Sequence, residues 1–250
     1  MDPAIDEAPR AAWLARQPPP TRSISRHYAP VTGLLLGGSL APAGMSANFI
    51  RRGLDEVLDT LVQWRRGVGH DPSTSGVALA DLPTALEPFQ AAWSREALFD
   101  CGDWTAYVNN GIQGGDPTAS ASYLGAALGV DVLTAMNSPL HPPGHASTQL
   151  WVEPGSDSKL GKRSIAAYAA DGRWSWIVNG APLPFEDESR YTARRVRDRF
   201  DRPLLVEYLR RNEIVVDDAT FYGRGVLVQQ GRQHRRRELS AEELRADLGL

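Results

Sequence analysis

Apolar residues recur at three- and four-residue spacing over residues 46–66, and charged residues occupy most of the positions between them. This period is typical of an amphipathic α-helix that turns one stripe toward a core. Gly67 and Gly69 follow, and glycine commonly ends helices. We therefore predict a helix over 46–66. Its apolar stripe consists of Ile50, Leu54, Val57, Leu58, Leu61 and Trp64.

Shorter runs rich in β-branched and aromatic residues predict strands in the middle of the chain. Gly102-Asp103 and Asp171-Gly172 are favourable two-residue hairpin turns between neighbouring runs. Because strand follows strand after residue 130 with no helix between them, we expect an antiparallel meander there. The predicted strands are 97–101, 104–108, 130–136, 148–152, 164–170 and 173–178, with a rigid loop at 139–144.

Further helices are predicted around these strands. Asp116 and Pro117 suit the first positions of a helix that Gly129 ends. Two more helices are predicted at 187–200 and 203–212. The fold class that follows is α+β, with a meander-like antiparallel sheet of five or six strands. We expect helices at 46–66, 117–129 and 187–212 to pack on one face of that sheet.

The chain divides into three parts at the level of composition. Residues 1–22 mix charge with a run of three prolines and predict a flexible leader. Residues 23–212 are predicted to form a single α+β domain. Residues 213–250 then form a C-terminal extension with a strand at 225–229 and a short helix after Ser240. Ser240 and Glu243 have the spacing of a capping box.

The composition of the chain indicates a cellular compartment and a class of partner, but it does not identify a function. The single cysteine, Cys101, cannot form an internal disulfide, which favours a reducing compartment. No run of 18 apolar residues is present to span a membrane. We therefore expect a cytoplasmic protein with no membrane partner. The net charge of −3 argues against a nucleic-acid surface as the default.

Two stretches of sequence resemble a family of small uncharacterised proteins from actinobacteria. The first stretch covers 103–111 and continues to Gly115-Asp116-Pro117, and the second comprises 173–176, 180–186, 191–195 and 197–200. The resemblance extends over roughly residues 95–212. It implies one cooperative unit for the middle of the chain, and it implies no activity and no catalytic residue.

Motifs for metal, phosphate and nucleophile chemistry do not emerge from the sequence. His141 and His145 have the spacing of two zinc ligands on a helical turn, but Pro142 and Pro143 lie between them. The glycines of 111–115 precede a predicted helix without the Lys-Ser/Thr pair of a phosphate loop, and Asp116 would repel a phosphate. No serine lies in a nucleophile elbow. We therefore predict no metal site and no cofactor.

Several polar and aromatic residues are candidates for binding. Arg194 and Arg197 share one face of the predicted 187–200 helix with Arg190, a pattern that suggests an acidic partner or a salt-bridged solvent face. Trp174 and Trp176 share one face of a strand, where tryptophans usually form core and less often an exposed platform. The remaining candidates lie in or after the 104–108 strand: Trp104, Tyr107, Asn109, Asn110 and Asp116.

Three functions remain open from the sequence. The leading hypothesis is a non-catalytic protein-interaction protein of an immunity- or adaptor-like kind, because no catalytic cluster is recognisable. The second is an enzyme whose acid and base are carboxylates distant in sequence, since such pairs have no local signature. The third is nucleic-acid binding through the arginine-rich run at 232–237. The candidate carboxylates for the enzyme are Asp103, Asp116, Glu153 and Glu186.

Overall fold

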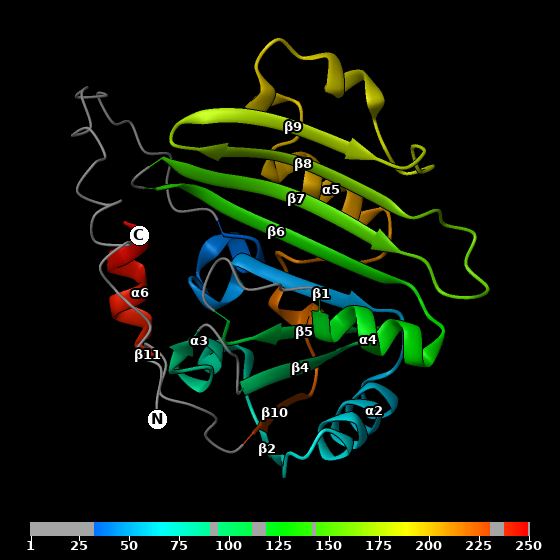
Figure 1. Ribbon diagram of the computed structural model, residues 1–250, viewed down its shortest axis with the longest axis vertical. Coiled ribbons are helices and arrows are strands. Elements are labelled where there is room, and N and C mark those ends of the chain that lie inside the picture. The colour runs from blue at the N-terminus through cyan, green and yellow to red at the C-terminus, as the bar shows by residue number, and fades with distance from the viewer. Residues whose placement is uncertain (1–32, 91–94, 112–118, 142–143, 231–237, 250) are drawn as a thin grey trace, which may run out of the picture.

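The computed structural model describes residues 33–90, 95–111, 119–141, 144–230 and 238–249. One antiparallel sheet of nine strands dominates it, in the order β2-β10-β4-β5-β1-β6-β7-β8-β9 (Figure 1). The predicted α+β class and antiparallel sheet are confirmed, although the sheet has nine strands where five or six were predicted. The strands are β1 (Ser46–Ile50), β2 (Ser73–Gly76), β4 (Arg95–Cys101), β5 (Trp104–Asn109), β6 (Val132–His141), β7 (His145–Glu153), β8 (Arg163–Ala170), β9 (Arg173–Asn179) and β10 (Gly225–Gln229).

Short helices and 3-10 turns surround this sheet, and β3 (Phe89–Gln90) pairs with β11 (Glu238–Leu239) in a separate two-stranded sheet. The α-helices are α2 (Leu54–Gly67), α3 (Leu82–Ala85), α4 (Ala119–Leu128), α5 (Arg202–Arg210) and α6 (Ala241–Leu248). The 3-10 turns are η1 (Leu35–Gly38), η2 (Ala43–Met45), η3 (Leu79–Asp81), η4 (Glu188–Thr192), η5 (Val196–Asp198) and η6 (Ala219–Phe221).

The helix predicted over 46–66 is wrong in its first quarter, where the chain forms β1. This strand pairs with β5 on one side and β6 on the other, so it lies in the interior of the sheet. Ala47 and Phe49 enter one core and Ile50 enters the other. Pairing on both sides and burial on both faces outweigh the helical period. Residues 51–53 are not helical either, and the rest of the predicted range is α2, which ends at Gly67 as predicted.

Strands β6 to β9 are consecutive neighbours, which confirms the predicted meander. Asp171 and Gly172 connect β8 to β9 with φ angles of 50° and 76°, as a two-residue hairpin turn with two positive φ angles requires. The loop predicted at 139–144 is wrong in part. Strand β6 continues through Pro139 to His141 after a shift in register, and β7 begins at His145.

Helices cover both faces of the sheet, so the expectation of packing on one face is wrong. α2 and α4 enclose one core with Leu98, Tyr107 and Val132 of the sheet. α5 packs on the opposite face in a larger core that includes Phe49 and Leu150, and α6 contributes to the same core beside β11. Consecutive residues of one strand therefore enter different cores, which a single amphipathic pattern does not reveal.

The helix predicted at 187–200 is also wrong, because this stretch forms the two short turns η4 and η5. The Asp187 side chain accepts a hydrogen bond from the Ser189 backbone N–H, a local turn that competes with a helix. Ala193 and Arg195 have extended ψ angles between the turns. The helix predicted at 203–212 is confirmed as α5, which Asp201 caps through the Leu204 N–H.

The C-terminal segment contributes directly to the sheet. The predicted strand 225–229 is confirmed as β10, which lies between β2 and β4. The predicted terminal helix is confirmed as α6, and Ser240 and Glu243 form the capping box. The proposed leader at 1–22 lies outside the described residues.

Candidate functional site

The two faces of the β6–β9 meander differ in what covers them. Residues that pair across neighbouring strands point to the same face, so the register assigns each side chain to a face. One face carries buried Leu133, Leu150 and Ile165 and packs on α5, which lies behind β7 and β8 in Figure 1. We call this the core face of the meander.

The opposite face of β6–β9, here called the open face, is not covered by a helix of the described chain (Figure 1). α2 and α4 lie on the same side of the sheet, but they cover β4, β5, β1 and the start of β6. The register places Glu153 and Arg173 at the two ends of this face. Its central part consists of Thr134, Met136, Ser138, Ser147, Gln149, Trp151, Ser164, Ala166, Tyr168, Ser175, Ile177 and Asn179, of which Thr134, Ser138 and Ala166 are buried.

None of these twelve side chains carries a charge. They combine hydroxyls and amides with two large aromatic rings, Trp151 and Tyr168, which are half-buried by their neighbours. Ile177 is 43% exposed near the edge of the sheet. Protein interfaces are depleted of charged residues and enriched in Trp, Tyr and Met, which this central part shares with them. They are also depleted of Ser and Ala, which supply five of the twelve positions here.

A pocket of about 510 Å³ lies where β7, β8 and β9 reach one end of the open face. Trp151, Ser164 and Asn179 follow one another across three paired strands and line it. Glu153 and Lys162 form an ion pair at this end, with 3.7 Å between Lys162 Nζ and Glu153 Oε1. The pocket therefore adds an ion pair at one end of the face, and Arg173 lies on the same face at the other end of β9.

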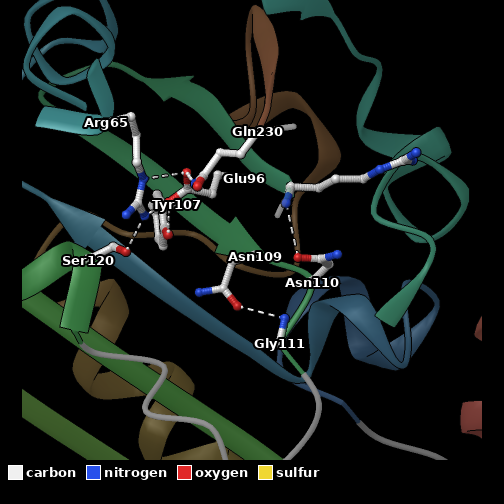
Figure 2. Close-up of polar contacts among 9 residues, drawn as sticks. Arg65, Glu96, Tyr107, Asn109, Asn110, Gly111, Ser120 and Gln230 are labelled. Carbon is white, nitrogen blue, oxygen red and sulfur yellow. Dashed lines mark hydrogen bonds and ion pairs between the residues drawn. The ribbon is translucent and has the colours of Figure 1, made fainter. Parts of the chain in front are cut away.

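A buried carboxylate joins α2 and α4 to the other half of the sheet (Figure 2). Glu96 has no exposed surface, and Arg65 binds it through Nε at 3.0 Å and Nη2 at 2.5 Å. Tyr107 donates its hydroxyl to the same carboxylate at 2.6 Å, and Gln230 donates its amide at 2.7 Å. Arg65 also donates to Ser120 of α4 at 2.8 Å.

Burial and the neighbouring Glu96 charge raise the pKa of Tyr107 well above its usual value, so the phenol remains a proton donor. The carboxylate is thus satisfied from several sides and shielded from solvent. Such a network fixes the packing of α2 and α4 rather than offering a group to a substrate.

A second buried ion pair fastens the segment after β9. Arg163 of β8 binds Glu186 through Nε at 2.8 Å and Nη2 at 2.6 Å, and both side chains are nearly inaccessible. Tyr191 donates to Glu186 at 2.8 Å and lies 3.0 Å from the Tyr208 hydroxyl. The backbone after β9 is therefore held against β8 and α5.

The four carboxylates considered for an enzyme are not brought together by the fold. Asp103 lies exposed in the turn between β4 and β5, in the other half of the sheet. Glu153 pairs with Lys162, and Glu186 is buried with Arg163. Asp116 lies outside the described residues. Each described carboxylate thus has its own surroundings, and no acid–base pair is formed among them.

The predicted binding residues of β5 have structural roles. Trp104 is 2% exposed and donates its indole N–H to the Asn212 carbonyl at 3.1 Å. Asn109 accepts from the Gly111 N–H at 2.9 Å, and the side chain of Asn110 accepts from the Arg95 N–H at 3.0 Å (Figure 2). These side chains shape the end of β5.

The predicted pair Trp174 and Trp176 lies on the core face of the meander. Both rings pack against the large core, and Trp176 lies 5.1 Å from the Tyr191 ring. This is the core alternative rather than the exposed platform. Arg194 and Arg197 are exposed on the segment after β9, and Arg197 lies 3.7 Å from Asp198.

The open-face residues themselves were missed from the sequence. The signal was present in β7, where Ser147, Gln149 and Trp151 alternate with buried Leu150 and Val152. Alternation identifies two faces of a strand. Alternation does not show which of the two faces a helix will cover. The predicted binding residues Trp174 and Trp176 lie on the core face of β9.

The fold and the site together define the class: an α+β protein whose nine-stranded antiparallel sheet has one face half covered by helices and half open. Within the described residues, no cluster of three or more His, Cys, Asp or Glu side chains could hold a metal ion. No helix in that part of the chain is long and apolar enough to cross a membrane. Comparisons with known protein families, curated proteins and solved structures find no match.

Proposed function

We propose that this chain is a non-catalytic interaction protein, immunity- or adaptor-like, which binds another protein in the cytoplasm through the open face of β6–β9. The observation that carries the proposal is the open face itself. Twelve uncharged side chains lie across its four paired strands, and nine of them are at least partly exposed.

The rigidity of the meander supports this proposal. Strands β7, β8 and β9 pair without a register shift, and the core face beneath them is packed with buried aliphatic side chains. A preformed surface loses little conformational entropy on binding. Four strands of seven to ten residues span roughly 15 by 25 Å, which suits the centre of an interface of about 800 Å² per partner.

The charged residues around the open face supply a rim for the same interface. Glu153 and Lys162 lie at one end, and Arg173 lies exposed at the other end of β9. Uncharged centres with polar rims are the usual arrangement in protein interfaces.

The other two hypotheses lack comparable support. The enzyme has no assembled carboxylate pair among the described residues, and the arginine run at 232–237 lies outside them. Membership of the actinobacterial family remains a prediction.

The test is affinity capture of the full chain from the cytoplasm of its own host, with partners quantified by mass spectrometry. In the test variant, Gln149→Arg and Tyr168→Arg place two charges at the centre of the open face. The control, Thr74→Arg, adds charge at exposed β2 on the other edge of the sheet. We expect a stoichiometric partner with the wild type and the control, and its loss with the variant. A partner retained by the variant, or no stoichiometric partner at all, would contradict the proposal.

A further inference from the structure

Strand β9 forms one edge of the nine-stranded sheet. Its inner side pairs with β8 over seven residues, Arg173 to Asn179. Its outer backbone groups form no hydrogen bond with any residue in the described part of the chain. Free N–H and C=O groups on a sheet edge are a template for another strand.

Two features that commonly keep edge strands from pairing, proline and a break in register, are missing from β9. It contains no proline and one charged residue, Arg173, and its register with β8 is continuous. Ile177 and Val178 are 43% and 39% exposed on its two faces. The opposite edge, β2, is a four-residue Ser-Thr-Ser-Gly strand with no apolar side chain. Of the two edges, β9 is the one suited to accept a strand.

Arginines line the segment that follows β9. Residues 188–199 hold five arginines and two acidic residues, in a chain whose net charge is −3. η5 packs near β8 and β9, and Figure 1 shows the segment looping past the β9 edge. Arg194 and Arg195 are exposed and form no ion pair with a described residue. Positive charge therefore lies beside the free edge.

We infer that the β9 edge accepts an extended acidic segment of a partner protein. The backbone of that segment would pair with β9, and its carboxylates would form ion pairs with Arg194 and Arg195, the charge-assisted contacts for which guanidinium groups are suited. The inference rests on the proposed interaction function but uses the edge of the sheet rather than the open face.

A second copy of this chain fits the same edge less well. Pairing β9 with another β9 would bring two arginine-rich 188–199 segments toward each other. β9 itself offers Arg173 and no carboxylate to offset them. Like charges placed across an interface oppose association. Charge thus favours an acidic partner over self-pairing.

The probe is a synthetic ten-residue peptide of alternating glutamate and valine, with a fluorescent label, titrated with the full chain. A glutamine-for-glutamate peptide is the matched neutral probe. We expect saturable binding of the acidic peptide, weakened about tenfold by Arg194→Glu with Arg195→Glu and by 0.5 M salt. Arg66→Glu, which reverses an exposed charge at the end of α2, should leave the affinity unchanged.

Amide hydrogen exchange tests the backbone pairing, because only strand addition protects the outward amides of β9. Protection is expected within 173–179 and not in β2 when the acidic peptide is present. Equal binding of both peptides, unchanged affinity in the double variant or unprotected β9 amides would each overturn the inference. Concentration-dependent dimers with protected β9 amides in the absence of peptide would also overturn it in favour of self-pairing.

These outcomes are independent of the open-face test. Gln149→Arg with Tyr168→Arg should leave peptide binding unchanged, because these side chains lie on β7 and β8 and project from the open face, whereas the peptide backbone pairs with the outer edge of β9. Failure of the peptide to bind would leave capture through the open face intact. Loss of capture with retained peptide binding would identify the edge as a separate site.

Discussion

The Glu96 carboxylate lies at the meeting point of α2, α4, β4 and β5, and it has no exposed surface. Arg65 contacts it with two nitrogens, so most of the cost of burying either charge is offset by the other. The pair is therefore sensitive to removal of one partner. Removing Glu96 would leave the buried Arg65 guanidinium without its carboxylate partner.

We expect Glu96→Ala to lower the free energy of unfolding by about 3–5 kcal/mol, the range found when one member of a buried pair is removed. Denaturant unfolding with circular dichroism measures the change. Glu56→Ala provides a control, because Glu56 is exposed and its pair with Arg52 spans 3.8 Å. That control should change stability by less than about 0.5 kcal/mol. A loss below about 1 kcal/mol for Glu96→Ala would contradict the structural role.

The Cys101 thiol gives a pH dependence with a definite sign. Burial raises its pKa from 9.0 to about 12. Above pH 9 the unfolded thiol loses its proton while the folded thiol keeps it. The contribution of Cys101 to the free energy of unfolding is therefore fully present below pH 9. It is lost as pH rises toward 12, at up to about 1.4 kcal/mol per pH unit.

Cys101→Ala should accordingly show a shallower loss of stability between pH 9 and 11 than the wild type. The tyrosines with raised pKa, Tyr107, Tyr191, Tyr208 and Tyr222, still contribute in both proteins. The difference between the slopes measures the thiol together with its charge interaction with Tyr222, whatever the variant does to stability at neutral pH. Identical slopes would show that the thiol ionises equally in both states.

At the scale of elements, α4 approaches β6 closely through a glycine. A Cβ atom built on Gly125 would lie 2.3 Å from Val132 Cγ2 and 3.3 Å from the Val130 carbonyl oxygen. Val132 is 1% exposed within the core that α2 and α4 share. The helix can therefore pack at this distance only with glycine at the contact.

Gly125→Ala should destabilise the protein by about 1–3 kcal/mol through overpacking. Helix propensity alone predicts the opposite sign, a gain of about 1 kcal/mol. Thermal unfolding decides between them, and Gly67→Ala at the end of α2 is the control, since its Cβ meets nothing within 4 Å. A stabilised Gly125→Ala variant would refute the close packing of α4 on β6.

Elements with a single local cause were predictable from the sequence. The Asp171-Gly172 hairpin, α5 and the capped α6 follow from turn and cap residues. Elements decided by distant partners were not. β1 is a strand because β5 and β6 pair with it, and 187–200 breaks into turns that Glu186 and Arg163 hold in place. The hydrophobic period of a segment contains no information about such distant partners.

At the scale of the whole molecule, the helices divide the sheet into two halves of different character. α2 and α4 close one side over β4, β5 and β1, while the same side of β6–β9 remains open within the described chain (Figure 1). The meander was predictable, but its open face was not, because coverage depends on where helices far away in sequence come to lie. Trp151 and Tyr168 lie on an uncovered face only because no helix of the described chain packs over them.

Site-specific photo-crosslinking in living cells tests the open face most directly. A photoreactive phenylalanine analogue replaces Tyr168 on the open face, and in the control it replaces Tyr123, which is 42% exposed on α4. Both positions hold a tyrosine that is at least partly accessible. They therefore differ in the part of the molecular surface to which they belong and not in the chemistry of the side chain. The account predicts one discrete crosslinked protein partner from position 168 and none from position 123. No discrete adduct at 168, or the same adduct from both positions, would contradict it.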